Sequence, residues 1–175
     1  RGVRYATHVF NAMGRFSHRE PGASGVALVE ESVVCELICD GRHVHPDIVK
    51  LIAQMKGPER LALVTDSLPW LGLPPGRYER WNLEIVSDGE TARQLDGTLV
   101  GTVLPLHLVL QRFIEFTGWS LHSAVRCAAE TPARVLGIEN ERGTLQAGKS
   151  ATFLILTDDF EIQAVWIEGR KCAGL

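Results

Sequence analysis

Side chains that can bind a metal or move a proton follow three separate apolar runs of this 175-residue sequence. His8 follows the first run, Asp40 and His43 follow the second, and Asp66 follows the third. An imidazole nitrogen is a good ligand for Zn²⁺ or Fe²⁺, and such a metal lowers the pKa of its bound water towards 7. A carboxylate can then take a proton from that water and pass it to a leaving amine. These residue types indicate metal-assisted hydrolysis.

The elements that must position these side chains have the pattern of a parallel α/β fold. Residues 33–39 (VVCELIC) and 61–65 (LALVT) are predicted to be buried strands. The segment 46–56 between them has a helical pattern, with Pro46 in its first turn. Polar residues at the carboxyl end of each strand are typical of parallel α/β construction. In a (β/α)₈ barrel those ends open on one face, so we expect the polar side chains to converge there.

The second half of the chain is expected to add antiparallel strands and further helices. The turn signals Asp88-Gly89 and Asp96-Gly97 predict short antiparallel strands over 77–89 and 91–99. Helical patterns return at roughly 103–117 and 120–130, and β-type runs occupy 152–157 and 162–168.

Composition excludes some classes of partner and indicates a compartment. A net charge of −3 and a pI near 6.1 provide no electrostatic footprint for nucleic acid or an anionic membrane. No apolar run approaches the roughly 20 residues that span a bilayer. The cysteines lack CxxC spacing and are expected to be reduced, mostly buried thiols in a cytoplasmic protein: Cys35, Cys39, Cys127 and Cys172. The first residues lack a Met and start almost inside a strand, so we interpret the chain as a fragment.

A series of motifs then occurs in order along essentially the whole chain. They are 7-THVFNAM-13, 19-REPG-22, 40-DGRHVHP-46, 63-LVTDS-67, 97-GTLVGT-102, 120-SLHSAVRCAAETPARVLGI-138 and 143-GTLQAGKSA-151. Together they closely resemble the C-terminal half of the N-acetylglucosamine-6-phosphate deacetylases, which belong to the amidohydrolase superfamily. The THxFNAM and LVTD motifs are specific to this family, whereas the GxLxxGKxA tail is shared across the superfamily.

This resemblance implies an α/β fold with two parts. Residues 1–140 would form the C-terminal portion of a TIM-type (β/α)₈ hydrolase barrel, with a β-hairpin insertion near 77–99. Residues 141–175 would form the C-terminal strands of a small β-sandwich domain. The implied reaction, in amino-sugar catabolism, is hydrolysis of N-acetylglucosamine 6-phosphate to glucosamine 6-phosphate and acetate.

The resemblance also implies a role for each matching residue. His8 resembles a ligand of a divalent metal, zinc or iron, and Asp66 resembles the catalytic acid and base. Arg19 resembles an arginine that binds the substrate phosphate from the neighbouring subunit of a homodimer; without the family it could be a surface charge. The positions that resemble substrate-binding residues are Asn11, Ala12, Arg19, Asp40, His43, Leu99, Val100 and Gly101.

Two departures from the family pattern bear on activity. The family takes a metal-binding glutamate and an earlier histidine from strands that this chain does not contain, so the isolated chain is expected to be inactive. The bulky 68-LPW-70 follows Asp66, where the family commonly has small residues. Two alternatives remain: another amide or cyclic-amide hydrolase of the superfamily, and a non-catalytic half-barrel fragment that binds a phosphosugar.

Overall fold

A three-stranded parallel sheet forms the centre of the fold. A computed structural model describes residues 2–80 and 82–172 of the chain. The sheet has the order β1-β2-β3, and both strand pairs are parallel. Its strands are β1 (Tyr5–Ala6), β2 (Val34–Ile38) and β3 (Leu61–Val64). The predicted strands at 33–39 and 61–65 are confirmed, each a little shorter than expected.

The helix between β2 and β3 is also confirmed, and its ends follow from local chemistry. α2 (Pro46–Lys56) has Pro46 at its start, where a missing N–H costs nothing. The ring of His45 accepts a hydrogen bond from the backbone N–H of Asp47 at 3.2 Å. Gly57, with φ of 62°, follows the last helical residue, because a residue without Cβ adopts that conformation freely.

The first helix was not predicted from the sequence. It is α1 (Gly22–Val29), which follows Pro21. Its buried side is made of small residues and one leucine: Ser24, Gly25, Ala27 and Leu28. A periodicity carried by small side chains is a weak signal, since these residues add little apolar area. Packing of the helix against the sheet decides the conformation.

The buried ammonium of Lys56 ties α2 to the end of α1. Its Nζ donates to the carbonyl oxygens of Ala27 and Glu30, both at 2.9 Å, and the residue is only 1% exposed. These bonds satisfy carbonyls that the last turn of a helix leaves free. Burial lowers the pKa of Lys56 below its ordinary value. This contact fixes how the first two helices lie against each other.

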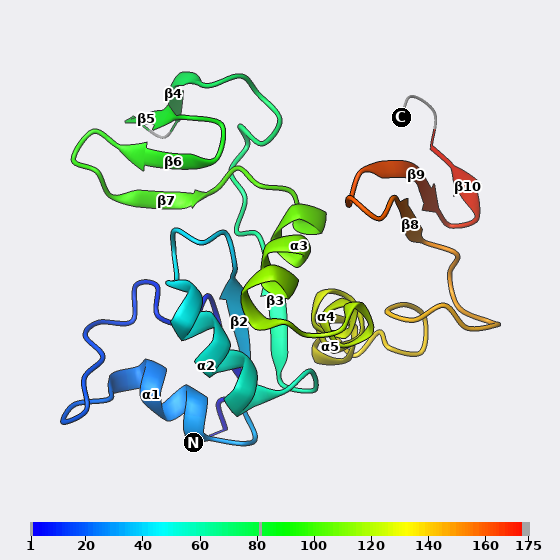
Figure 1. Ribbon diagram of the computed structural model, residues 1–175, viewed down its shortest axis with the longest axis horizontal. Coiled ribbons are helices and arrows are strands. Elements are labelled where there is room, and N and C mark those ends of the chain that lie inside the picture. The colour runs from blue at the N-terminus through cyan, green and yellow to red at the C-terminus, as the bar shows by residue number, and fades with distance from the viewer. Residues whose placement is uncertain (1, 81, 173–175) are drawn as a thin grey trace.

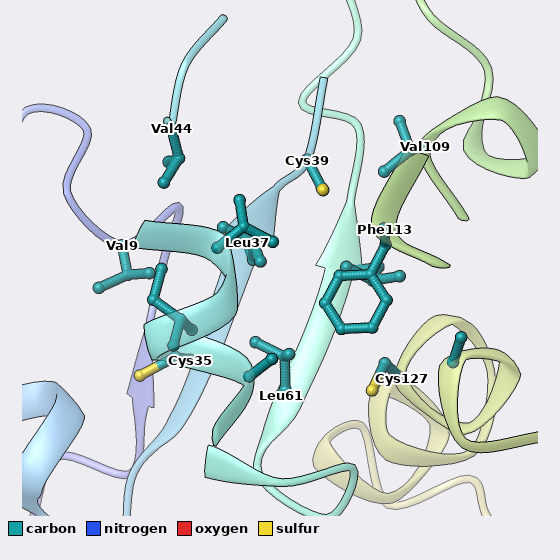
Figure 2. Packing of buried hydrophobic residues seen from close by; sticks show 14 of the residues in the cluster. Val9, Cys35, Leu37, Cys39, Val44, Leu61, Val109, Phe113 and Cys127 are labelled. Atoms are coloured by element: carbon teal, nitrogen blue, oxygen red, sulfur yellow. The ribbon is translucent and has the colours of Figure 1, made fainter. Parts of the chain in front are cut away.

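Three more helices complete one face of the sheet. They are α3 (Leu106–Thr117), α4 (Leu121–Ala128) and α5 (Glu130–Val135), of which α5 was not predicted. Figure 2 shows Leu37 and Leu61 of the sheet pointing towards Phe113 of α3, with Cys127 of α4 beside them. All four are almost fully buried, at 0% exposure. The main core therefore lies between the sheet and its helices.

The expected burial of reduced thiols is confirmed for three of the four cysteines. All four are free, and Cys172 is half-buried. Cys35 and Cys39 lie in the main core between the sheet and its helices. Cys127 is buried in the same core.

The expected hairpin insertion is a four-stranded antiparallel sheet of order β4-β5-β6-β7. Its strands are β4 (Gly76–Arg80), β5 (Leu83–Ser87), β6 (Thr91–Gln94) and β7 (Leu99–Thr102). The two predicted Asp-Gly turns are confirmed, because they join β5 to β6 and β6 to β7. Figure 1 shows this sheet above the carboxyl ends of β2 and β3.

A third sheet ends the chain. It has the order β10-β9-β8 and is antiparallel throughout, with strands β8 (Phe153–Leu156), β9 (Ile162–Ile167) and β10 (Arg170–Lys171). It lies beyond α4 and α5, away from the parallel sheet (Figure 1). Within residues 2–80 and 82–172, the helices lack the combination of length and apolar character that a membrane crossing requires.

Candidate active site

The three candidate residues occupy equivalent places at the carboxyl edge of the parallel sheet. His8 lies two residues after the end of β1, Asp40 two after β2 and Asp66 two after β3. Because β1, β2 and β3 run in the same direction, these positions lie at the same edge. The convergence expected from the sequence is confirmed at the level of the backbone.

The backbone of the His8 loop is held in an unfavourable conformation. His8, Phe10 and Ala12 have φ angles of 32°, 75° and 54°. Left-handed residues other than glycine are uncommon, and each costs of the order of 1–3 kcal/mol unless the surroundings hold it. Three of them within five residues indicate a loop whose shape is imposed by its contacts. Strain of this kind is concentrated at functional sites.

Glu36 of β2 supplies several of those contacts. One carboxylate oxygen accepts from the hydroxyl of Tyr5 at 2.7 Å, and the other accepts from the N–H of His8 at 3.2 Å. Its backbone carbonyl accepts from the N–H of Val9 at 2.9 Å. Burial, and then the bond to Glu36, raise the pKa of Tyr5 well above its ordinary value. Glu36 therefore anchors both the strand before His8 and the turn after it.

The ring of His8 is oriented by the turn that follows it. Its Nδ1 lies 3.1 Å from the backbone oxygen of Asn11, and the Asn11 amide donates back to the carbonyl oxygen of His8 at 3.3 Å. With the proton on Nδ1, the ring donates to that carbonyl and leaves the Nε2 lone pair available. This is the usual arrangement of a metal-ligating histidine. The donor chemistry of His8 thus fits one ligand of a divalent metal.

The described residues do not form a complete set of metal ligands by themselves. Across residues 2–80 and 82–172, no group of three or more His, Cys, Asp or Glu side chains is arranged to hold a metal ion. A catalytic zinc normally has three protein ligands and one open position. His8 can therefore be only one contributor to such a site.

Asp40 and His43 form a buried pair. The Nδ1 of His43 lies 2.6 Å from Oδ2 of Asp40, and the two side chains are only 6% and 0% exposed. The other carboxylate oxygen accepts from the backbone N–H groups of Arg42 and His43, at 2.8 and 2.9 Å. Burial alone would raise the pKa of Asp40, but the hydrogen bonds from His43 and Arg42 hold that pKa below its ordinary value. The ionised carboxylate fixes Nδ1 as the donor of the His43 ring.

Asp66 differs from Asp40 because its side chain is exposed. Its φ is 47°, and its backbone oxygen accepts from the N–H of Thr102 at 3.2 Å. The neighbouring Ser67 forms a parallel bridge with Thr102. The carboxylate of Asp66 is therefore open to solvent, while the bond from Thr102 holds the backbone that carries it.

β7 places the predicted loop 99–101 directly beside Asp66. Gly101 has φ of 89°, and a Cβ built on it would lie 2.5 Å from the backbone oxygen of Asp66. Only glycine permits this approach. Gly101 is therefore brought next to Asp66 and carries Leu99 and Val100 with it, although residues 67–98 separate the two segments.

The remaining predicted site residues are more exposed than Asp40. Arg19 is exposed, on the loop before α1, and forms no hydrogen bond or ion pair with another part of the chain that the structure describes. Ala12 is also exposed, whereas Asn11 is half-buried. Trp70, from the bulky segment after Asp66, is 7% exposed and stacks on Tyr78 with ring centroids 5.7 Å apart. It belongs to the core of the inserted sheet.

Sequence reasoning missed Glu36, Tyr5 and Arg112 as parts of this region. The guanidinium of Arg112, from α3, donates to the backbone oxygen of Asp40. A signal existed for Glu36, because it is the one charged residue in the run 33–39. Tyr5 and Arg112 carry no local signal, since their partners come from other elements.

Comparison with known proteins supports the motif reading. The model of the amidohydrolase family matches residues 3–172. An N-acetylglucosamine-6-phosphate deacetylase from Bacillus subtilis is 39% identical over 161 residues, which are 92% of this chain and 41% of that protein. The human deacetylase of the same name is 37% identical over 175 residues, 97% of this chain and 42% of its own. The chain thus spans about two fifths of the length of these relatives.

One relative is of similar length to this chain. A putative N-acetylgalactosamine-6-phosphate deacetylase from Escherichia coli K12 is 35% identical over 163 residues, 93% of this chain and 97% of that protein.

Solved structures show the same likeness in three dimensions. A deacetylase for N-acetylglucosamine 6-phosphate from Thermotoga maritima has a TM-score of 0.90 at 32% identity, over 97% of this chain and 47% of that one. A variant from Mycobacterium smegmatis, solved with N-acetylglucosamine 6-phosphate, has a TM-score of 0.90 at 34% identity, over 97% and 45%.

Proposed function

Because the chain belongs to the amidohydrolase family, we propose that its native polypeptide hydrolyses N-acetylglucosamine 6-phosphate to glucosamine 6-phosphate and acetate. The observation that carries this proposal is the common edge at which His8, Asp40 and Asp66 follow β1, β2 and β3. The names of the relatives from Bacillus subtilis and human supply the substrate.

The fold in which this chain works is proposed to be a (β/α)₈ barrel. Residues 1–140 would contribute its last strands and helices, with the inserted sheet, and residues 141–175 would contribute strands of a small β-sandwich domain. The supporting observation is a parallel sheet that carries its helices on one face and candidate site residues at its carboxyl edge.

We propose that Nε2 of His8 supplies one ligand to a divalent metal, zinc or iron. The other protein ligands would lie in the portion of the longer relatives that this chain does not span. When bound, such a metal polarises the acetyl carbonyl and provides a nucleophile at neutral pH. The hydrogen bonds that His8 donates to Glu36 and to the carbonyl of Asn11 hold its backbone and ring for this task.

Asp66 is proposed to move the proton. Its exposed carboxylate would take a proton from the attacking water and deliver it to the nitrogen of the leaving amine. The backbone bond from Thr102 and the close packing of Gly101 restrict where that carboxylate can lie. This restriction is what a proton carrier needs, because transfer requires hydrogen-bond distance to both partners.

The substrate is proposed to lie between the loops that follow β1, β2 and β7. Nε2 of His43, with Nδ1 held by Asp40, would contact a sugar hydroxyl or the acetyl group. The side chain of Asn11 and the backbone of Ala12 would bind the phosphosugar, and the backbone of residues 99–101 would line it. The buried carboxylate of Asp40 would act through His43 and not by touching the substrate.

Arg19 is proposed to bind the phosphate group of a substrate molecule that lies in the active site of the neighbouring subunit of a homodimer. Its guanidinium is exposed, and a planar fork of donors suits a phosphate. We also propose a cytoplasmic location, in keeping with four free thiols, three of which are buried.

A second candidate substrate is N-acetylgalactosamine 6-phosphate. The relative of matching length from Escherichia coli K12 carries that substrate in its name, as does one from Escherichia coli O157:H7 at 35% identity. The two sugars differ only in the orientation of one hydroxyl.

The test is acetate release by the purified native polypeptide, reconstituted with Zn²⁺ or Fe²⁺. The substrates are the two phosphosugars, unphosphorylated N-acetylglucosamine and a dihydroorotate-type cyclic amide. Preferred turnover of N-acetylglucosamine 6-phosphate is the expected result. Preference for the cyclic amide would assign a different hydrolase, and phosphosugar binding without turnover would identify a non-catalytic binding module.

A further inference from the structure

The inserted sheet β4–β7 contacts two of the three loops at the carboxyl edge. β7 runs beside the segment after β3, where Leu68 N–H donates to the Thr102 oxygen at 3.0 Å. At the other side, the turn between β5 and β6 carries Glu90, whose carboxylate lies 3.5 Å from the guanidinium of Arg42. Arg42 belongs to the loop of Asp40 and His43. The sheet therefore joins the Asp66 segment to the His43 loop.

Arg112 completes this connection from the helix side. One nitrogen of its guanidinium donates to the backbone oxygen of Asp40, and another lies 3.7 Å from the carboxylate of Glu90. One turn further along α3, the ring of Phe116 lies against Gly41, where an added Cβ would be 3.1 Å from Cζ. α3 thus presses on the residue pair Asp40-Gly41 with two side chains of one face.

The position of the His43 ring depends on these contacts. Its Nδ1 is bonded to the Asp40 carboxylate at 2.6 Å, so a shift of the Asp40 backbone moves the ring directly. The Asp40 carboxylate has 0% exposure, and both of its oxygens form hydrogen bonds within its own loop. Nothing in those internal bonds ties the loop to the rest of the molecule. The bond from Arg112 to the Asp40 oxygen does so.

We propose that Arg112 is a positioning residue, which acts through Asp40 to hold the imidazole of His43, and that Glu90 of the inserted sheet holds the guanidinium of Arg112. The inserted sheet then aligns two loops of the site at once, through Glu90 at one and through Thr102 at the other. The proposed use of His43, contact with substrate, rests on the proposed function. The mechanical link between Arg112 and His43 does not.

The direct test is the Nδ1 proton of His43 in the native polypeptide, observed by ¹H–¹⁵N NMR and assigned with His43→Asn. Arg112→Gln should increase the solvent exchange rate of that proton roughly 10-fold, because the Asp40 loop loses a charge-assisted bond. Arg126→Gln is the matched control. Its side chain is 26% exposed against 25% for Arg112, and its partners are Glu59 and Glu130, away from this loop. The control should leave the proton unchanged.

Kinetics separate positioning from general stability. Arg112→Gln should raise KM for the phosphosugar roughly 10-fold and lower kcat by a smaller factor, and Arg112→Lys should restore part of the loss. Arg126→Gln should leave both constants unchanged even if it lowers the melting temperature. If Arg112→Gln does not fold, Arg112→Lys and Glu90→Gln are measured in its place. Each should lower kcat/KM for the phosphosugar about 3-fold. Glu90 is 53% exposed, so salt should screen its interaction with Arg112. We therefore expect 1 M salt to lower kcat/KM of the unaltered protein by about as much as Glu90→Gln does.

The outcomes are distinct. An unchanged His43 proton in Arg112→Gln, or in both fallback variants, would overturn the proposal, as would equal effects of the Arg112 and Arg126 variants. Failure of the unaltered protein to deacetylate any phosphosugar would overturn the proposed function, while the exchange rate of the His43 proton would still decide the link.

Discussion

Replacement of Gly101 by alanine is expected to displace the backbone that carries Asp66. The new Cβ would lie 2.5 Å from the Asp66 backbone oxygen, about 0.9 Å short of the 3.4 Å at which ordinary contact begins. It would also meet Cγ of Leu68 at 3.2 Å. The obstructing atom belongs to the backbone, so a change of side-chain rotamer cannot relieve the overlap. The carboxylate of Asp66 should therefore move by about 0.9 Å.

Two effects of this change can be estimated. A misplacement of about 1 Å at a reacting group can reduce the rate on the order of 10²-fold. Separately, an alanine at φ of 89° costs about 1–2 kcal/mol of folding stability, since only glycine adopts that conformation without strain. For a chain of this size the second effect corresponds to a fall of about 2–8 °C in melting temperature.

Gly97 provides the matched control in the same segment. Its φ is also 89°, but a Cβ built there would meet nothing within 4 Å. Gly97→Ala should therefore lower the melting temperature by a similar amount and leave kcat/KM for the phosphosugar nearly unchanged. The assay is thermal unfolding together with acetate release by both variants of the native polypeptide. Equal losses of activity in the two variants, or full activity in Gly101→Ala, would refute the packing argument.

Three further predictions concern single side chains. Asp66→Asn should lower kcat by roughly 10²–10⁴-fold while metal content measured by atomic absorption stays near that of the unaltered protein; retained activity would remove Asp66 as the proton carrier. Arg19→Ala should weaken discrimination between N-acetylglucosamine 6-phosphate and N-acetylglucosamine by about 1.5–3 kcal/mol in kcat/KM; equal loss on both substrates would make Arg19 structural. Because the folded state lowers the pKa of Asp40 from its ordinary 3.8, the unfolded chain binds that proton more tightly. Folding stability should therefore fall as pH drops from about 3.8 through the lowered pKa, and denaturant titrations should show a flatter acid limb for Asp40→Asn.

Local patterns were sufficient for some of the regular elements of this chain, but not for α1 and α5. β2, α2 and β3 were predictable because an apolar run, a proline at a helix start and a polar strand end are all signals within about ten residues. The Asp-Gly turns of the inserted sheet were predictable for the same reason. α1 was not, because small side chains provide its buried face and their burial depends on what packs against them.

The sequence by itself also determined which residue types follow each strand, and hence that His8, Asp40 and Asp66 share one edge once the strands are parallel. It could not determine which residues of other elements hold these side chains in place. Glu36 of β2 contacts Tyr5 on the neighbouring strand β1 and His8 just after it, and Arg112 contacts Asp40, 72 residues away in the sequence. Gly101 fits against Asp66 only after the inserted sheet has folded back onto the segment behind β3. Such contacts form between elements distant in the chain, so their specificity lies in packing and hydrogen-bond geometry, which only the tertiary structure decides.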